Sequence, residues 1–155
     1  MAATIVAELE SGKSVNRVKG KITGFVENHS FLEAEVEIIM PGKHNITELN
    51  ALVRQMSALF REYVKINRNI PSEAIGAYEN INEPDRKMFY VAANLTQSMQ
   101  IKQSILQKYS LKDQLYEVIK ILNSEIDILK IEKEIEGKVQ ENINKSQRKF
   151  IIQEQ

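Results

Sequence analysis

Hydrophobic and polar residues follow two different periods along the chain, and the change falls near Pro41-Gly42. From residue 31 to residue 39, apolar side chains alternate with Glu33, Glu35 and Glu37. A period of two is typical of a β-strand with one face in a core and the other in water. The pattern therefore predicts a strand here, with its three carboxylates solvated.

A second, less regular alternation runs from Val15 to Val26, and Asn28-His29 supplies turn chemistry between the two runs. Together they predict a β-hairpin. A hairpin alone is marginal in water, because three or more strands or a covering helix are needed to bury one face. We expect either that these are the last strands of a larger sheet that begins outside this chain, or that the open edge pairs with another copy.

After residue 42 the apolar residues recur three and four positions apart, which predicts amphipathic helices. The first helix is expected to have Thr47 as its N-cap and to end near Asn69, before Ile70-Pro71. Later helices are expected to begin at Pro71, after the turn at residues 80–84, at a Thr96 cap, and at the Ser110/Asp113 capping box.

The last third of the chain predicts a long helix whose end protrudes from the domain. Its apolar stripe thins after Leu129 to about one residue in four: Ile131, Ile135, Val139 and Ile143. Such a narrow stripe cannot seal a compact core. We expect charge pairs to support the helix, namely Lys130 with Glu134, Glu134 with Lys138, and Glu141 with Lys145, against the helix-weakening Gly137.

The predicted fold class is mainly α with a small β portion. It consists of the C-terminal strands of a β-lobe followed by a helical bundle that ends in a long protruding helix. The expected domains are a partial β-lobe at 1–42, a helical subdomain at 43–110 and an arm at 111–155.

The amino-acid composition mainly excludes certain classes of protein and of chemistry. Lys plus Arg and Asp plus Glu number 21 each, so no net positive field favours nucleic acid. The absence of cysteine excludes disulfides and thiolate catalysis and suits a reducing compartment. The apolar run at residues 1–7 is too short for a signal peptide, and no run approaches the roughly 20 apolar residues of a membrane span.

Motifs for catalysis or cofactor binding are likewise absent from the sequence. Gly12-Lys13-Ser14 lacks the upstream glycine of a phosphate-binding loop, and neither His29 nor His44 lies near a candidate nucleophile. Carboxylates on one strand face stand nearly 7 Å apart, so Glu33, Glu35 and Glu37 indicate a solvated face and no metal site. We therefore predict no catalytic residue, cofactor or metal ligand in this chain.

The apolar residues near the end of the arm are the remaining candidates for contact: Ile143, Phe150, Ile151 and Ile152. One interpretation is that they pack on protein that follows in a longer parent chain. The other is that they contact an unfolded polypeptide or a neighbouring subunit, because exposed apolar patches usually mark contact sites.

Several segments resemble the amino-terminal region of Lon proteases. They include Ile70-Pro71-Ser72-Glu73, the run from Asn80 to Arg86, and Lys102 to Gln107. The resemblance is strongest from Ser124 to Leu129 and on through Ser146 to Gln155, which is similar to the end of the family's long helix. Lys149-Phe150-Ile151 stands where the family more often has Glu-Tyr-Tyr. The likeness covers about residues 45–155, and the hairpin more loosely.

This resemblance implies a non-catalytic, substrate-recruiting and assembly region of a hexameric ATP-dependent serine protease that degrades damaged or regulatory proteins. The ATPase, which would use ATP and Mg, and the catalytic residues would lie outside this chain. The implied partners are unfolded or tagged proteins and other subunits of the homo-oligomer, with no membrane, and the implied location is the cytoplasm or an organelle matrix.

Two alternatives remain open at this point. The last helix could act as a structural coiled-coil adaptor that pairs with its own copy, although its apolar steps of four fit a left-handed heptad seam poorly. Nucleic-acid binding is less favoured, because the basic residues between 13 and 21 lack interleaved aromatic side chains.

Overall fold

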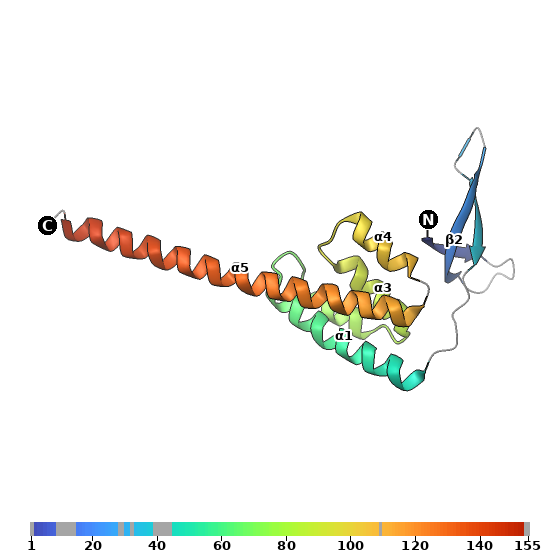
Figure 1. Cartoon of the computed structure of the whole chain (residues 1–155), viewed down its shortest axis with the longest axis horizontal. Coiled ribbons are helices and arrows are strands. Elements are labelled where there is room, and N and C mark those ends of the chain that lie inside the picture. The colour runs from blue at the N-terminus through green and yellow to red at the C-terminus, as the bar shows by residue number, and fades with distance from the viewer. Residues whose placement is uncertain are drawn as a thin grey trace.

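The computed structural model describes residues 2–8, 15–27, 30–31, 33–38, 45–108 and 110–153, and it describes side chains only from residue 20 onward. Three parts follow one another along the longest axis in Figure 1: a small sheet near the N-terminus, a helical body, and one long helix that reaches the C-terminus. The predicted fold class, mainly α with a small β portion and a protruding last helix, is confirmed.

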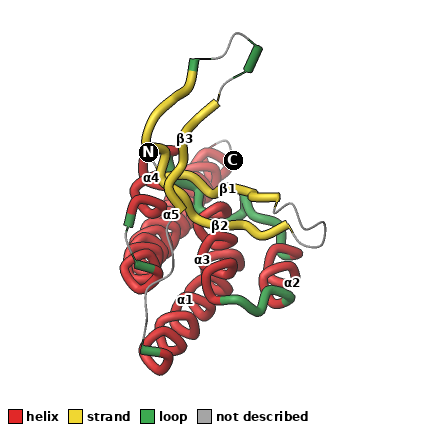
Figure 2. Tube along the Cα trace, turned by 90° about the vertical axis from the view of Figure 1, so that its right-hand side faces the viewer, coloured by secondary structure: helices red, strands yellow, loops and turns green. Residues whose placement is uncertain are grey.

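The sheet has three antiparallel strands in the order β1-β2-β3, with β1 at Ala2–Glu8, β2 at Val15–Val26 and β3 at Glu33–Ile38. The predicted hairpin is β2 with β3, and its turn at Asn28-His29 lies outside the described residues. The sequence analysis missed β1, which pairs with the first half of β2 and contacts a helix of the body. Figure 2 shows the strands at one end of the helical body.

The body consists of five helices around one core. They are α1 (Ile46–Ile66), α2 (Glu73–Glu79), α3 (Pro84–Asn94), α4 (Met99–Gln107) and the first part of α5 (Leu111–Gln153). The main contact joins α1 and α5, which lie side by side. Tyr63, Tyr78 and Phe60 are the largest fully buried side chains, and Tyr78 packs on Phe60 with ring centroids 5.2 Å apart.

The helix ends differ from the predictions in three places. Asn45, not Thr47, caps α1, because its side chain accepts a hydrogen bond from the Thr47 backbone N–H at 3.1 Å. The same helix stops at Ile66 and not near residue 69. Ser98, not Thr96, caps α4, since its hydroxyl accepts from the Ile101 N–H.

The predicted capping box at the start of α5 is confirmed. The Asp113 N–H donates to the Ser110 hydroxyl at 3.1 Å, and that hydroxyl donates to the Asp113 carboxylate at 2.7 Å. The box fixes the start of a 43-residue helix. At 1.5 Å per residue such a helix is about 65 Å long.

Core packing on α5 stops well before the helix does. Its last buried residue is Ile126, and the side chains from residue 130 to residue 153 are all exposed. Two ion pairs fasten this exposed part to the body: Lys130 to Glu62 at 2.7 Å and Arg68 to Glu136 at 3.3 Å. Lys130 thus pairs across to α1 rather than with Glu134, while the predicted pair of Glu141 with Lys145 is present at 2.6 Å.

Candidate polypeptide-contact surfaces

Two exposed apolar surfaces stand out among the described residues, one on the sheet and one on α5. The first, which we call the sheet face, comprises the half-buried Ile22 and the exposed Phe25, Val36 and Ile38. Ile22 is the direct cross-strand partner of Val36, and Phe25 is the partner of Ala34. Because direct partners in antiparallel strands project to the same side, these residues share one face.

The exposure of the sheet face shows that one prediction was wrong. The alternation in residues 31–39 was expected to place its apolar side in a core, yet Val36 is 39% exposed and Ile38 is 55% exposed. The physical reason is that β1 occupies an edge of the sheet instead of a face, so no described element covers Val36 and Ile38. The opposite side, with Glu33, Glu35 and Glu37, is largely solvated as predicted.

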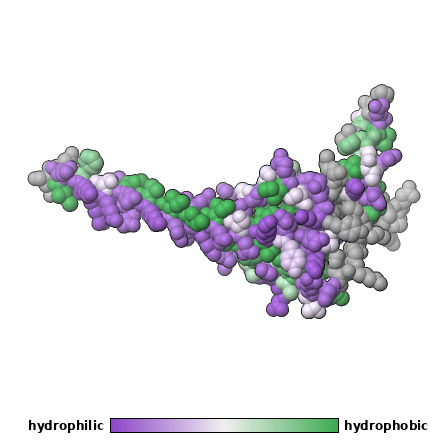
Figure 3. Space-filling model, in the orientation of Figure 1, coloured by the Kyte–Doolittle hydropathy of each residue, from purple (hydrophilic) through white to green (hydrophobic). Residues whose placement is uncertain are grey.

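The second surface, which we call the arm stripe, runs along the exposed part of α5. Its members are Ile128, Ile131, Ile135, Val139, Ile143 and Phe150. Residues two apart on a helix point in nearly opposite directions. Ile126 is only 3% exposed against the core, whereas Ile128 is 47% exposed. Figure 3 shows hydrophobic side chains in a row along the protruding helix.

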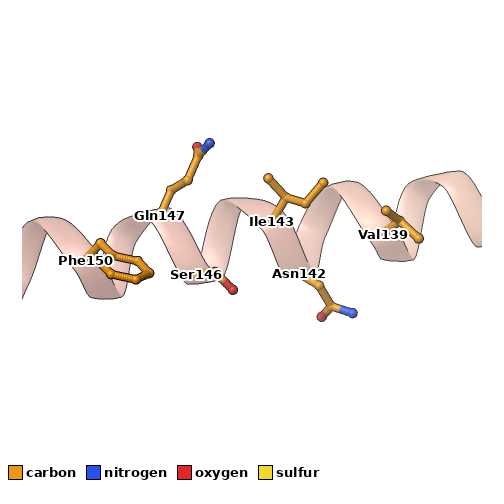
Figure 4. A pocket seen from close by; sticks show the side chains of 6 residues that line it. All are labelled: Val139, Asn142, Ile143, Ser146, Gln147 and Phe150. Atoms are coloured by element: carbon orange, nitrogen blue, oxygen red, sulfur yellow. The ribbon is translucent and has the colours of Figure 1, made fainter.

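The four predicted contact residues fall into two groups on α5. Ile143 and Phe150 belong to the arm stripe, where they line a shallow open groove with Val139, Asn142, Ser146 and Gln147. Figure 4 shows these side chains spread along the helix. Ile151 and Ile152 are also exposed, but they do not line the groove. One and two positions after Phe150, they point to other sides of the helix.

The described part of the chain contains neither a cluster of metal-binding side chains nor a helix that could span a membrane. No group of three or more His, Asp or Glu side chains gathers there as a metal site. None of the described helices is long and apolar enough to cross a membrane. The Gly12-Lys13-Ser14 segment, His29 and His44 lie outside the described residues.

Charged side chains of the body serve mainly to join helices. Lys112 of α5 donates to Glu48 of α1 at 2.7 Å, and this bond holds the pKa of the Glu48 carboxyl below its ordinary value and raises the pKa of Lys112. The bond to Glu62 likewise raises the pKa of Lys130. Burial raises the pKa of Tyr78, whose hydroxyl shares a hydrogen bond with Ser57. None of these groups forms a constellation suited to catalysis.

Among the described residues, a three-stranded sheet, a helical body and two exposed apolar surfaces suit a domain that binds other proteins. The chain belongs to the family described as the ATP-dependent protease La (LON) substrate-binding domain, whose family model matches residues 14–124. This membership confirms the resemblance stated above, and it confirms that this chain provides a binding domain and not the catalytic part.

Similar proteins include the Lon protease of Azospirillum brasilense and Lon protease 1 of Bacillus subtilis, each 31% identical over 137 residues. The Lon protease of Escherichia coli K12 is 29% identical over 137 residues. Each of these alignments covers 88% of this chain, but the chain spans only about 17–18% of the length of these relatives.

Proposed function

We propose that this chain recruits polypeptide substrates for a Lon-type ATP-dependent protease and helps to assemble its subunits. Its substrates would be unfolded or tagged proteins, including damaged and regulatory ones. The ATPase, with its ATP and Mg, and the serine protease would belong to the rest of the parent protein. A cytoplasmic or organelle-matrix location and a hexameric parent are parts of the same proposal.

The observation that carries the substrate-recruiting half of the proposal is the exposed sheet face. The family model of the substrate-binding domain matches residues 14–124, which include β2, β3 and the body but not the protruding end of α5. Within that range, Phe25, Val36 and Ile38 are exposed large apolar side chains that share one sheet surface. An unfolded polypeptide exposes apolar side chains that a folded protein buries. An exposed apolar surface therefore favours binding of the unfolded polypeptide over the folded one.

The arm stripe supports the assembly half of the proposal. It lies outside the range that the family model matches and beyond the folded body, where Ile143 and Phe150 are exposed. Contact between subunits there would bury apolar surface that the isolated chain leaves in water. Ile151 and Ile152 extend the candidate contact at the tip.

Binding of a permanently unfolded polypeptide, compared with the folded form of the same polypeptide, tests the recruiting function. We expect fluorescence anisotropy to show binding of the unfolded form only. Val36→Ser combined with Ile38→Ser should weaken that binding about tenfold or more, because two apolar contacts of roughly 1 kcal/mol each are lost.

The matched control changes the other side of the same strand. Glu35→Ser combined with Glu37→Ser should leave the affinity within about twofold, because these carboxylates point away from the sheet face. Equal binding of folded and unfolded polypeptide, or equal losses in the two double variants, would contradict the proposal.

A further inference from the structure

The strand β3 forms an open edge of the sheet. The strand order is β1-β2-β3, so among the described residues β3 has a neighbouring strand on one side only. At the other edge β1 contacts α4, whereas β3 contacts no described element except β2. Every residue from Ala34 to Ile38 is exposed, and Figure 1 shows the hairpin of β2 and β3 extending away from the helices. A further strand therefore has access to β3.

The backbone groups at this edge can be assigned from one hydrogen bond. The Glu35 carbonyl faces β2, because it accepts from the Thr23 hydroxyl at 3.3 Å. Successive residues of a strand direct their backbone N–H and C=O groups to opposite sides. The backbone groups of Ala34 and Val36 therefore point to the open edge, where an added strand would bond to them.

The side chains of β3 give each face of this edge its own chemistry. Val36 and Ile38 are exposed on the sheet face. Glu33, Glu35 and Glu37 alternate with them and so lie on the opposite face. An added strand would continue both faces, so its side chains would lie alternately in apolar and in acidic surroundings.

The acidic face is only partly neutralised by its own sheet. Lys21 is the cross-strand partner of Glu37, while the partners of Glu33 and Glu35 are uncharged. Three carboxylates and one ammonium group leave these four side chains with a net charge of −2. Basic side chains on an added strand would complement Glu33 and Glu35.

From the open edge and its two faces we infer that β3 takes up an extended segment of the recruited polypeptide as a fourth strand of the sheet. The segment alternates apolar residues, beside Val36 and Ile38, with basic residues, beside Glu33 and Glu35. Backbone hydrogen bonds supply affinity that tolerates many sequences, and the alternating side chains supply the preference. The inference rests on the proposed recruiting function and specifies how the polypeptide is held.

A second copy of the chain suits this edge less well than such a segment. Two β3 strands paired antiparallel would place glutamate beside glutamate, which Coulomb repulsion disfavours. A shift of one residue would place glutamate beside valine or isoleucine instead. Both registers lack the charge complementarity that a basic segment provides.

Backbone methylation of a peptide tests strand addition directly. The probe is a short peptide in which valine and lysine alternate, methylated either on the valine nitrogens or on the lysine nitrogens. Only one of these two sets of N–H groups faces β3 in an added strand. One methylated peptide should therefore bind about tenfold or more weakly, because several hydrogen bonds are lost, and the other should bind within about twofold of the parent peptide. Equal effects of the two methylations would overturn the inference.

Hydrogen exchange of the full chain tests which protein groups are bonded. Saturating amounts of the valine–lysine peptide should slow exchange of the Ala34 and Val36 amides by about tenfold or more, because these amides gain hydrogen bonds. The Glu35 amide, which faces β2, is the internal control and should be affected much less. Equal protection of the three amides, or protection of none, would contradict an added strand at this edge.

The charge preference is tested with peptides that carry lysine, serine or glutamate between the valines. At low salt the lysine peptide should bind tightest and the glutamate peptide weakest, with about twofold to thirtyfold at each step, because opposite charges attract and like charges repel. Glu33→Ser combined with Glu35→Ser should remove most of this order. An order that persists in the double variant, or none in the wild type, would contradict the assigned faces.

This preference is small for a whole unfolded polypeptide. About three quarters of the residues in an ordinary polypeptide are uncharged. Its segments therefore meet the acidic face mostly with uncharged side chains, which agrees with the control on Glu35 and Glu37 described above.

The inference and the recruiting function fail separately. Binding of unfolded polypeptide without any binding of the peptides, or with equal losses for both methylated peptides, would remove the added strand and leave the recruiting function in place. Absence of binding for both the peptides and the unfolded polypeptide would remove the recruiting function itself. Self-association of the chain that the peptide reverses would assign the edge to a second copy and overturn the inference.

Discussion

At the residue scale, one buried tyrosine joins the end of α1 to the segment that follows α3. The Tyr63 hydroxyl donates to the Thr96 hydroxyl at 2.9 Å and accepts from the Thr96 backbone N–H at 3.0 Å. Asn67 also donates to the Thr96 hydroxyl at 3.2 Å. Thr96 was predicted as a helix cap, but its polar groups are used to hold this tertiary contact.

Tyr63→Phe should therefore destabilise the fold by about 1–3 kcal/mol, because it leaves a partly buried N–H without its acceptor. Chemical denaturation followed by circular dichroism measures this loss. Tyr116→Phe is the control, since Tyr116 is exposed and its hydroxyl makes only a long bond of 3.4 Å to Glu48. Equal losses in both variants would contradict this role of Tyr63.

The Glu48–Lys112 bond gives a prediction on pH. Its hydrogen bond and charge keep the pKa of Glu48 lower in the folded chain than in the unfolded chain. The unfolded chain therefore binds more protons, so the stability from Glu48 is present above the ordinary carboxyl pKa and is lost as the pH falls through the folded value. Lys112→Met should flatten the dependence of Tm on pH below about pH 4.5. An unchanged acid slope would contradict it.

At the element scale, α5 changes its source of stability along its length. Its first part is held by buried side chains such as Leu115 and Leu122, while the part beyond Glu136 relies on helix propensity and surface pairs. Gly137 follows the tie between Arg68 and Glu136 directly and has open space around the position of an added Cβ. It is therefore a weak point where the arm leaves the body.

Gly137→Ala should stabilise the helix locally by about 0.8–1 kcal/mol, because alanine has the higher helix propensity and meets no atom there. Hydrogen exchange of the amides around residue 137 should slow by about fourfold to fivefold. Gly76→Ala, in the short helix α2, is a control that should leave exchange in the arm unchanged. Faster exchange near residue 137 would contradict the prediction.

At the scale of the whole molecule, the body and the arm are structurally separable. The last tie between the described part of the arm and the body is the exposed pair of Arg68 with Glu136. Removal of residues 138–155 should thus leave the Tm of the body unchanged within a few degrees. Thermal unfolding followed by near-ultraviolet circular dichroism reports on the buried tyrosines of the body. A large drop in Tm would show that the arm supports the core.

Local patterns in the sequence determined much of this protein. Four of its patterns depend only on residues that are close in the chain. They are the alternation in the strands, the helical spacing after residue 42, the Ser110/Asp113 capping box and the thinning apolar stripe after Leu129. Such short-range signals can be recognised without knowledge of the fold. The absence of cysteine and of a phosphate-binding loop can likewise be recognised from the sequence alone. The domain boundaries at 42 and 110 and the contact roles of Ile143, Phe150, Ile151 and Ile152 stay predictions.

Tertiary structure alone decided the rest. Residues 2–8 become a strand because β2 offers them an edge, and Thr96 bonds to Tyr63 because α1 passes beside it. The exposure of Val36 and Ile38 depends on which elements cover the sheet, and the alternating pattern is the same for a covered and an uncovered face. These outcomes depend on contacts between residues far apart in the chain, which no local pattern encodes.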